Sequence, residues 1–213
     1  MFKAVLWDFG GVITTSPFEA FNRFEDENGI PLDFIRGVNS TNPEANAWAQ
    51  LESSKISVDE FDALFERESA NLGYAIPGAN VLKLLSGDIR PEMVNALSII
   101  KQQIKIGCIT NNVKSGEGPG MARDETKANA VSEVMDMFDV LIESSKVGMR
   151  KPDPEIYKLA CNEIGVEPSE AVFLDDLGIN LKPAKALGMS TIKVLSADQA
   201  LTDLETLLGF PLR

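Results

Sequence analysis

Acidic and polar side chains follow three separate apolar runs of this chain. Asp8 comes directly after residues 2–7, Thr110-Asn111 follows residues 104–109, and Asp175-Asp176 follows residues 171–174. If the runs are parallel strands, their carboxyl ends meet at one edge of the sheet and these side chains converge. Gathered carboxylates repel one another, and a hard divalent cation such as Mg²⁺ relieves that repulsion. An Asp at a strand end is also common as a turn residue or helix cap, so this reading depends on the convergence.

A lysine between two prolines is the candidate cation for this edge. Lys151 lies in the segment 148–154, where Pro152 and Pro154 restrict the backbone. A loop lysine usually carries only a solvated charge, but here we expect a point charge that meets a phosphate. On that reading, Lys151→Met should leave thermal stability unchanged or higher.

Composition excludes several kinds of chemistry. The 213 residues include no His, which rules out Ser-His-Asp and Cys-His catalysis, His-ligated zinc and imidazole acid/base chemistry. The net charge of −12 would repel a phosphate backbone, so we expect no nucleic-acid partner. Cys108 and Cys161 lack metal-like or redox-like spacing and are expected to be buried thiols. No apolar run reaches the length of a membrane span or signal sequence, so we expect a cytoplasmic protein off the membrane.

Strand and helix patterns alternate over most of the chain. A fourth apolar run, at residues 140–142, precedes Glu143, and the stretch 154–164 has the pattern of a helix, with Asp153 as its N-cap and Gly165 after its end. Such alternation predicts an α/β fold with a doubly wound parallel sheet.

Residues 16–88 interrupt the alternation with helix signals alone. Ser16 begins a capping-box pattern with Pro17 at the first helical position, and further helix starts are predicted at Asn42-Pro43 and Ser57. We therefore predict a core domain from residues 1–15 and 89–213 and a small all-helical cap at 16–88. An insert after the first strand lies over the sheet edge where α/β folds bind ligands.

Taken together, the motifs resemble those of the haloacid dehalogenase superfamily. The resemblance covers the whole chain and rests on four segments in order, namely Trp7-Asp8-Phe9-Gly10-Gly11-Val12, Ile109-Thr110-Asn111, Lys151-Pro152 and Phe173-Leu174-Asp175-Asp176 with Asn180 after them. Four ordered motifs are specific, whereas any one alone is weak. Within the superfamily, the segments around Lys151 and Asp175 look most like the phosphatase domain of soluble epoxide hydrolase and the related domain of an acyl-CoA dehydrogenase family.

The resemblance implies a Rossmann-like core, a C1 cap and a role for each motif. Asp8 would be the nucleophile that accepts a phosphoryl group, Thr110 and Asn111 would hold the phosphoryl oxygens, and Lys151 would offset the charge. Mg²⁺ would be bound by Asp8, the Gly10 carbonyl and Asp176, with Asp175 in the same metal shell.

Gly10 departs from the family pattern. Phosphatases of the superfamily normally carry a second Asp there, whose side chain protonates the leaving oxygen; such proton transfer contributes about 10²–10⁴ in rate. The Gly10 carbonyl remains available to a metal. Glu143 and Glu117 are the nearest acids that could replace the missing proton donor, although a surface role is the simpler reading of each.

Three functions are compatible with these residues. The first is Mg²⁺-dependent hydrolysis of a small phosphomonoester through an aspartyl-phosphate. The second is a catalytically weakened domain that binds a phosphorylated ligand or a protein, because Gly10 replaces the acid. The third, 2-haloacid dehalogenation, is disfavoured because a metal-free site has no reason to keep the Asp175-Asp176 pair. The substrate and the oligomeric state are left open by the sequence.

Overall fold

A five-stranded parallel sheet forms the centre of the protein. The structure is a computed structural model that describes residues 1–112 and 125–213. The strand order is β3-β2-β1-β4-β5, and each neighbouring pair is parallel. The strands are β1 (Ala4–Trp7), β2 (Lys105–Thr110), β3 (Val140–Glu143), β4 (Ala171–Asp175) and β5 (Ser190–Lys193). The predicted α/β fold with a doubly wound sheet is confirmed.

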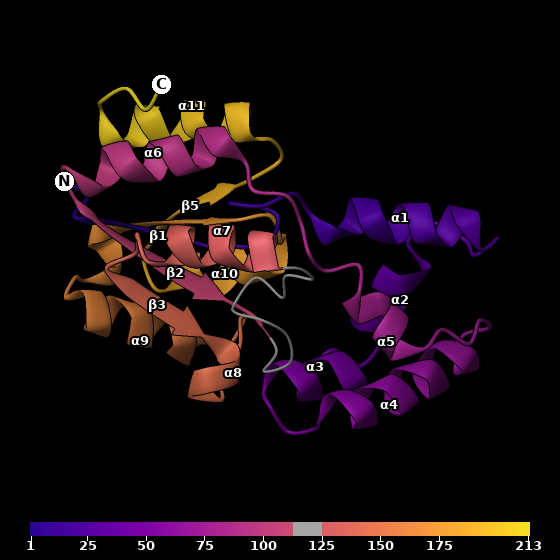
Figure 1. Cartoon of the computed structure of the whole chain (residues 1–213). Coiled ribbons are helices and arrows are strands. Elements are labelled where there is room, and N and C mark those ends of the chain that lie inside the picture. The colour runs from indigo at the N-terminus through magenta and orange to yellow at the C-terminus, as the bar shows by residue number, and fades with distance from the viewer. Residues whose placement is uncertain (113–124) are drawn as a thin grey trace.

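Helices cover both faces of the sheet (Figure 1). The α-helices of the described residues are α1 (Pro17–Glu27), α2 (Phe34–Ser40), α3 (Ala47–Glu52), α4 (Val58–Asn71), α5 (Gly78–Leu82), α6 (Pro91–Lys101), α7 (Glu125–Met135), α8 (Ser144–Val147), α9 (Pro154–Ile164), α10 (Gly178–Ala186) and α11 (Ala197–Leu208). In Figure 1, α6 and α11 lie on one side of the sheet, and α9 and α10 lie on the other.

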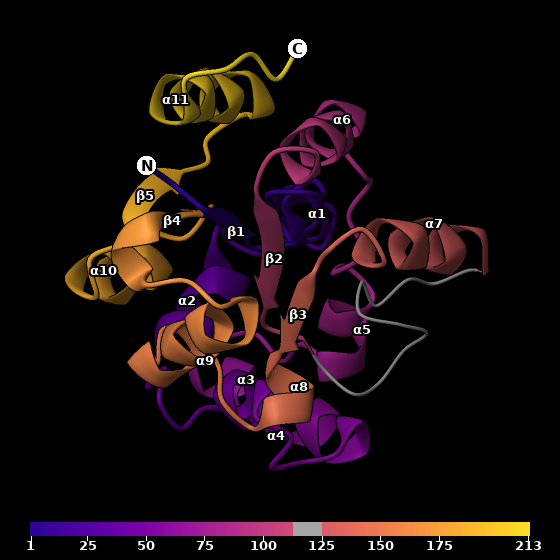
Figure 2. The same cartoon turned by 90° about the vertical axis from the view of Figure 1, so that its left-hand side faces the viewer.

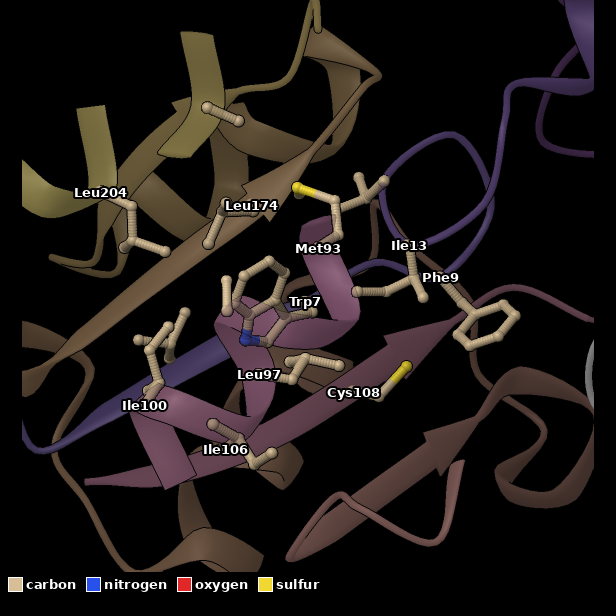
Figure 3. Packing of buried hydrophobic residues seen from close by; sticks show 14 of the residues in the cluster. Trp7, Phe9, Ile13, Met93, Leu97, Ile100, Ile106, Cys108, Leu174 and Leu204 are labelled. Atoms are coloured by element: carbon tan, nitrogen blue, oxygen red, sulfur yellow. The ribbon is translucent and has the colours of Figure 1, made fainter. Parts of the chain in front are cut away.

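Alternate residues of the strands enter two hydrophobic cores. From β1, Val5 and Trp7 face α6 and α11, whereas Ala4 and Leu6 face α9 and α10. Figure 3 shows Trp7 among Leu97 and Ile100 of α6, with Leu204 of α11 near them. All four residues of β1 are fully buried, as expected for the central strand of a sheet covered on both faces. Cys108 and Cys161 are both buried and free, as predicted.

Helices α1–α5 form a third cluster of their own, which includes Phe21, Phe61 and Phe65. This group lies off the carboxyl end of the strands, and in Figure 2 it is seen behind the sheet. The chain leaves and re-enters the core through two antiparallel segments, where Thr14 pairs with Ile89 and Thr15 N–H donates to the Asp88 carbonyl. The exact division at residues 16–88 stays a prediction.

Two local expectations were wrong, and some short elements were not predicted. No helix begins at Asn42, because this residue takes a left-handed φ of 51°; α3 begins at Ala47 instead, with Asn46 as its N-cap. The Ser16 side chain accepts from Phe18 N–H but forms no capping box, whereas Ser57 forms a complete one with Glu60. The edge strand β5 and the short helices α2 and α5 were not predicted.

Candidate active site

Three carboxylates meet at the carboxyl edge of the two central strands. Asp8 follows β1, Asp175 ends β4, and these strands pair in register with Trp7 opposite Leu174. One oxygen from each of Asp8, Asp175 and Asp176 lies within 4.8 Å of the others. The structure therefore brings together the acidic residues that the motif analysis singled out.

Lys151 is the cation of this cluster. Its Nζ lies 2.8 Å from Asp8 Oδ1 and 2.8 Å from Asp175 Oδ2, and the residue is only 1% exposed. Burial alone would lower the pKa of Lys151, but attraction to Asp175 and Asp8 outweighs this effect, so the pKa is raised and the ammonium keeps its proton. A solvated loop charge is excluded. The peptide bond from Lys151 to Pro152 is cis.

The pKa values of Asp8 and Asp176 are also raised, which for an acid disfavours the charged form. Burial raises the pKa of Asp8 well above its usual value, and although Lys151 counteracts this, Asp175 and Asp176 add to it. Burial, followed by repulsion from Asp175, raises the pKa of Asp176 to about 6. Three acids thus share one lysine, and the cluster has an excess of negative charge that a further cation would offset.

Asp175 is the most completely enclosed of the three. Its Oδ2 accepts from Lys151 Nζ at 2.8 Å, its Oδ1 accepts from Leu177 N–H at 2.8 Å, and the Asn180 amide donates to both oxygens. Tyr157 in turn donates its hydroxyl to the Asn180 carbonyl. These contacts hold the Asp175 carboxylate in place, and Asp175 in turn holds the Lys151 ammonium. Asp176, whose Oδ2 accepts from Ser16 Oγ at 3.4 Å, is the freer carboxylate.

Two adjacent glycines in the loop after β1 differ in what they allow. Gly11 has a φ of 77°, and a Cβ placed there would lie 2.2 Å from Asp176 Oδ2, so this position requires glycine. At Gly10 a Cβ would meet nothing within 4 Å, and the residue is exposed. Asp176 can therefore approach the loop because of Gly11, while Gly10 faces open space.

The donor set fits Mg²⁺. Asp8, Asp175 and Asp176 offer only carboxylate oxygens, which are the hard ligands that Mg²⁺ prefers. The close approach of Asp176 to Gly11 keeps its oxygens beside the loop that follows Asp8. The Gly10 carbonyl as a fourth donor stays a prediction.

Thr110 and Asn111 lie at the end of β2, the strand beside β1. Thr110 is buried. The side-chain amide of Asn111 contacts the backbone of Lys151 at two points. Asn111 Oδ1 accepts the Lys151 N–H at 2.9 Å, and Asn111 Nδ2 donates to the Lys151 carbonyl at 3.0 Å. The structure brings both residues to the site, where the Asn111 side chain contacts the Lys151 peptide.

Glu143, one of the two acids considered as proton donors, is not assigned that role by the structure. Glu143 is buried, accepts from Asn112 Nδ2 at 2.8 Å and pairs with Lys146. A surface role for Glu143 is therefore wrong, and its carboxylate is already engaged as part of the scaffold beneath the site. Glu117 lies outside the described residues.

Contacts between the helical insert and the core were not predicted. Arg150, next to Lys151, forms an ion pair with the buried Glu52 of α3 at 2.6 Å and donates to the Pro43 carbonyl at 3.2 Å. Ser54 Oγ donates to the Ser145 carbonyl at 3.1 Å. Burial raises the pKa of Glu52, although Arg150 opposes the change. The sequence carries no signal that would match these partners, because each contact joins residues about 90 or more positions apart.

The fold and the site define an α/β protein with a separate helical cluster and an acidic, lysine-containing cluster at the carboxyl edge of its sheet. The haloacid dehalogenase-like hydrolase family model matches residues 2–188, and the chain belongs to this family. The resemblance seen in the four motifs is thereby confirmed.

Curated relatives come from several organisms. The chain is 34% identical to acyl-CoA dehydrogenase family member 10 of Mus musculus, with 99% of the chain and 20% of the relative covered. It is 31% identical to bifunctional epoxide hydrolase 2 of Mus musculus, over 97% of the chain and 39% of the relative. It is 27% identical to the sesquiterpene phosphatase astK of Aspergillus oryzae, over 98% and 97%. The chain thus spans less than half the length of the first two relatives.

A solved structure of a haloacid dehalogenase family enzyme from Bacteroides thetaiotaomicron, in complex with magnesium and inorganic phosphate, has the same fold. The TM-score is 0.59 at 22% identity, with 90% of this chain and 93% of the other covered. Together with the phosphatase relative, the family places this chain among hydrolases related to phosphatases.

The buried position of Lys151 changes the expectation for Lys151→Met. Removing the ammonium leaves Asp8 and Asp175 buried without their cation, and breaking a buried ion pair from one side costs about 3–5 kcal/mol. We therefore expect the free energy of unfolding to fall by that amount in chemical denaturation, in contrast to the unchanged or higher stability expected from the sequence.

The matched control is Lys158→Met, which removes an exposed lysine paired with Glu155 on the surface of α9. That change should alter stability by no more than about 0.5 kcal/mol. Equal stability of the two variants would show that the Lys151 ion pairs contribute nothing to the fold.

Proposed function

We propose that this chain is a Mg²⁺-dependent phosphomonoester hydrolase that acts on a small phosphorylated molecule through an aspartyl-phosphate on Asp8. The observation that carries the proposal is the position of Lys151, whose ammonium lies between Asp8 and Asp175 with Asp176 beside them. A nucleophilic carboxylate, a fixed cation and a set of oxygen donors at one sheet edge are the parts that phosphoryl transfer needs.

Each side chain has a separate role in the proposed reaction. Asp8 attacks phosphorus, so that a bond forms between its oxygen and phosphorus while the ester bond breaks and the alkoxide leaves. Lys151 offsets the charge of the nucleophile and the phosphoryl oxygens, and Thr110 with the backbone N–H of Asn111 holds those oxygens. Water then cleaves the acyl-phosphate and releases inorganic phosphate and the free carboxylate of Asp8.

Asp8, Asp176 and the Gly10 carbonyl would hold Mg²⁺, with Asp175 in the surrounding shell through its contacts with Lys151 and Asn180. When bound, the ion supplies positive charge that offsets the phosphate and lets it approach three carboxylates. The helical insert formed by residues 16–88 would act as a cap that selects the substrate. One relative is a sesquiterpene phosphatase, which supports a phosphorylated small molecule as the substrate class.

The partners and the cellular location of this chain are proposals as well. The net charge of −12 argues against a nucleic-acid partner, and we propose a cytoplasmic site of action. Among the described residues, no helix combines the length and apolar character that crossing a membrane requires. The first two relatives are longer than this chain, and we propose for it no activity that depends on their other segments.

Gly10 favours a second candidate, a weakened domain that binds a phosphorylated ligand without turning it over. Gly10 provides no side-chain acid at the position where related phosphatases carry one, and its surroundings are open. Charge neutralisation by Lys151 would still hold a phosphate in such a domain.

A phosphatase screen separates the two candidates. The purified chain is incubated with Mg²⁺ and a panel of sugar phosphates, lipid phosphates and nucleotides, and released phosphate is measured. We expect one class of ester to be hydrolysed with turnover that EDTA abolishes. Trace turnover of the whole panel, combined with binding of inorganic phosphate in calorimetry, would instead support the binding domain. Hydrolysis that is unchanged in EDTA would reject the metal-dependent mechanism.

A further inference from the structure

The Asn111 side chain forms a two-point contact with the peptide unit of Lys151. Its Oδ1 accepts the Lys151 N–H at 2.9 Å, and its Nδ2 donates to the Lys151 carbonyl at 3.0 Å. The donor and the acceptor of one planar amide are therefore both engaged by a residue 40 positions away in the sequence. This pairing imitates the exchange of hydrogen bonds between two residues of adjacent strands.

A two-point contact fixes orientation as well as position. A single hydrogen bond leaves a peptide free to rotate about it, whereas a donor and an acceptor on the same plane define the direction of the backbone. The Lys151 ammonium must reach Asp8 Oδ1 and Asp175 Oδ2 together, each at 2.8 Å. Asn111 thus fixes the position of the Lys151 backbone, from which the Lys151 side chain extends to the two carboxylates.

The base of this contact is itself held firmly. Asn112, the next residue, donates its N–H to Ser144 Oγ at 3.0 Å and receives the Ser144 hydroxyl on its carbonyl at 3.1 Å. Its side chain donates to Glu143 and accepts from Ser145 N–H. These buried contacts tie Asn112, directly after Asn111, to the end of β3 and the start of α8.

We propose that Asn111 is a positioning residue whose side-chain amide clamps the Lys151 peptide, so that the Lys151 ammonium stays between Asp8 and Asp175. Lys151 engages one of the two Nδ2 protons and one lone pair of Oδ1, and we assign any phosphate contact of this residue to its backbone N–H. The kinetic consequence rests on the proposed phosphatase function, whereas the clamp itself does not.

A double-mutant cycle tests whether Asn111 acts through Lys151. Asn111→Ala should lower kcat by up to about 10²-fold with little change in KM, because a displaced ammonium stabilises the transition state less well. In a Lys151→Met background, the same substitution should cost nothing further, since there is no ammonium left to position. Fully additive losses in kcat, or a rise in KM alone, would overturn the proposal and indicate direct phosphate binding by the side chain.

Amide hydrogen exchange tests the clamp without any turnover. In Asn111→Ala the Lys151 N–H loses its acceptor, so its exchange should accelerate about fivefold or more, as follows from one hydrogen bond of about 1 kcal/mol. The matched control is Asn28→Ala, which removes an exposed amide that donates to the Phe24 carbonyl and should leave Lys151 exchange unchanged.

The two measurements separate the two ideas. Unchanged exchange at Lys151 in Asn111→Ala would reject the clamp whatever the activity. If the wild-type chain hydrolyses no phosphoester while Lys151 exchange accelerates as expected, the proposed function fails and the clamp stands. The exchange experiment also decides the outcome if the Lys151→Met variant does not fold.

Discussion

Asp8→Asn is expected to reduce phosphoester turnover by on the order of 10⁴-fold or more, because the substitution removes the nucleophile of the proposed mechanism and one oxygen donor of the metal site. The fold should survive, since Asn has the same shape and Lys151 keeps its ion pair with Asp175. The measurement is phosphate release at saturating substrate, together with circular dichroism of the variant.

The control for this variant is Asp26→Asn, the same chemical change at an exposed position in the last turn of α1. It should retain wild-type activity. EDTA should abolish turnover of the wild type, and added Mg²⁺ should restore it, since charge neutralisation of three carboxylates and a phosphate needs the cation. An Asn variant with wild-type activity would remove Asp8 from the mechanism.

The parallel sheet and the edge that carries the site could be predicted because both follow from local patterns, whereas the order of the strands was not predicted. The apolar runs before Asp8 and Asp175 are continuous, as strands buried on both faces require, and their polar ends then fall at one edge. β5 (Ser190–Lys193) was not predicted because it is only partly buried at the edge of the sheet and has no apolar run. The short helices α2 and α5 have too few turns to show a period.

What could not be predicted is how polar groups pair across long distances in the sequence. Lys151 has the local sequence of an exposed turn, and its burial arises only because Asp8 and Asp175 come from other strands. The same holds for Asn111, whose residue type suits a ligand contact and a backbone clamp equally well. Side-chain pairing of this kind depends on tertiary structure, whereas periodicity reports only which face of an element is buried.

Because Gly10 carries no acid, we expect the rate of the proposed reaction to depend steeply on the leaving group. Gly10 has no carboxyl group, Asp175 is engaged by Lys151 and Asn180, and Asp176 is proposed for the metal, so none of these three positions supplies a proton. The leaving oxygen then departs as an anion. We expect a nitrophenyl phosphate to be cleaved far faster than an alkyl phosphate when esters of graded leaving-group pKa are assayed with Mg²⁺.

Gly10→Asp should restore a general acid and accelerate the poor leaving groups by up to about 10²-fold, with little effect on the nitrophenyl ester. The structure allows this change, because a Cβ at Gly10 meets nothing within 4 Å. Gly11→Asp is the matched control: its Cβ would lie 2.2 Å from Asp176 Oδ2 and its φ of 77° disfavours a side chain, so activity should fall for every ester. A flat leaving-group dependence in the wild type would show that another residue already donates the proton, and Glu143→Gln and Glu117→Gln would then identify it.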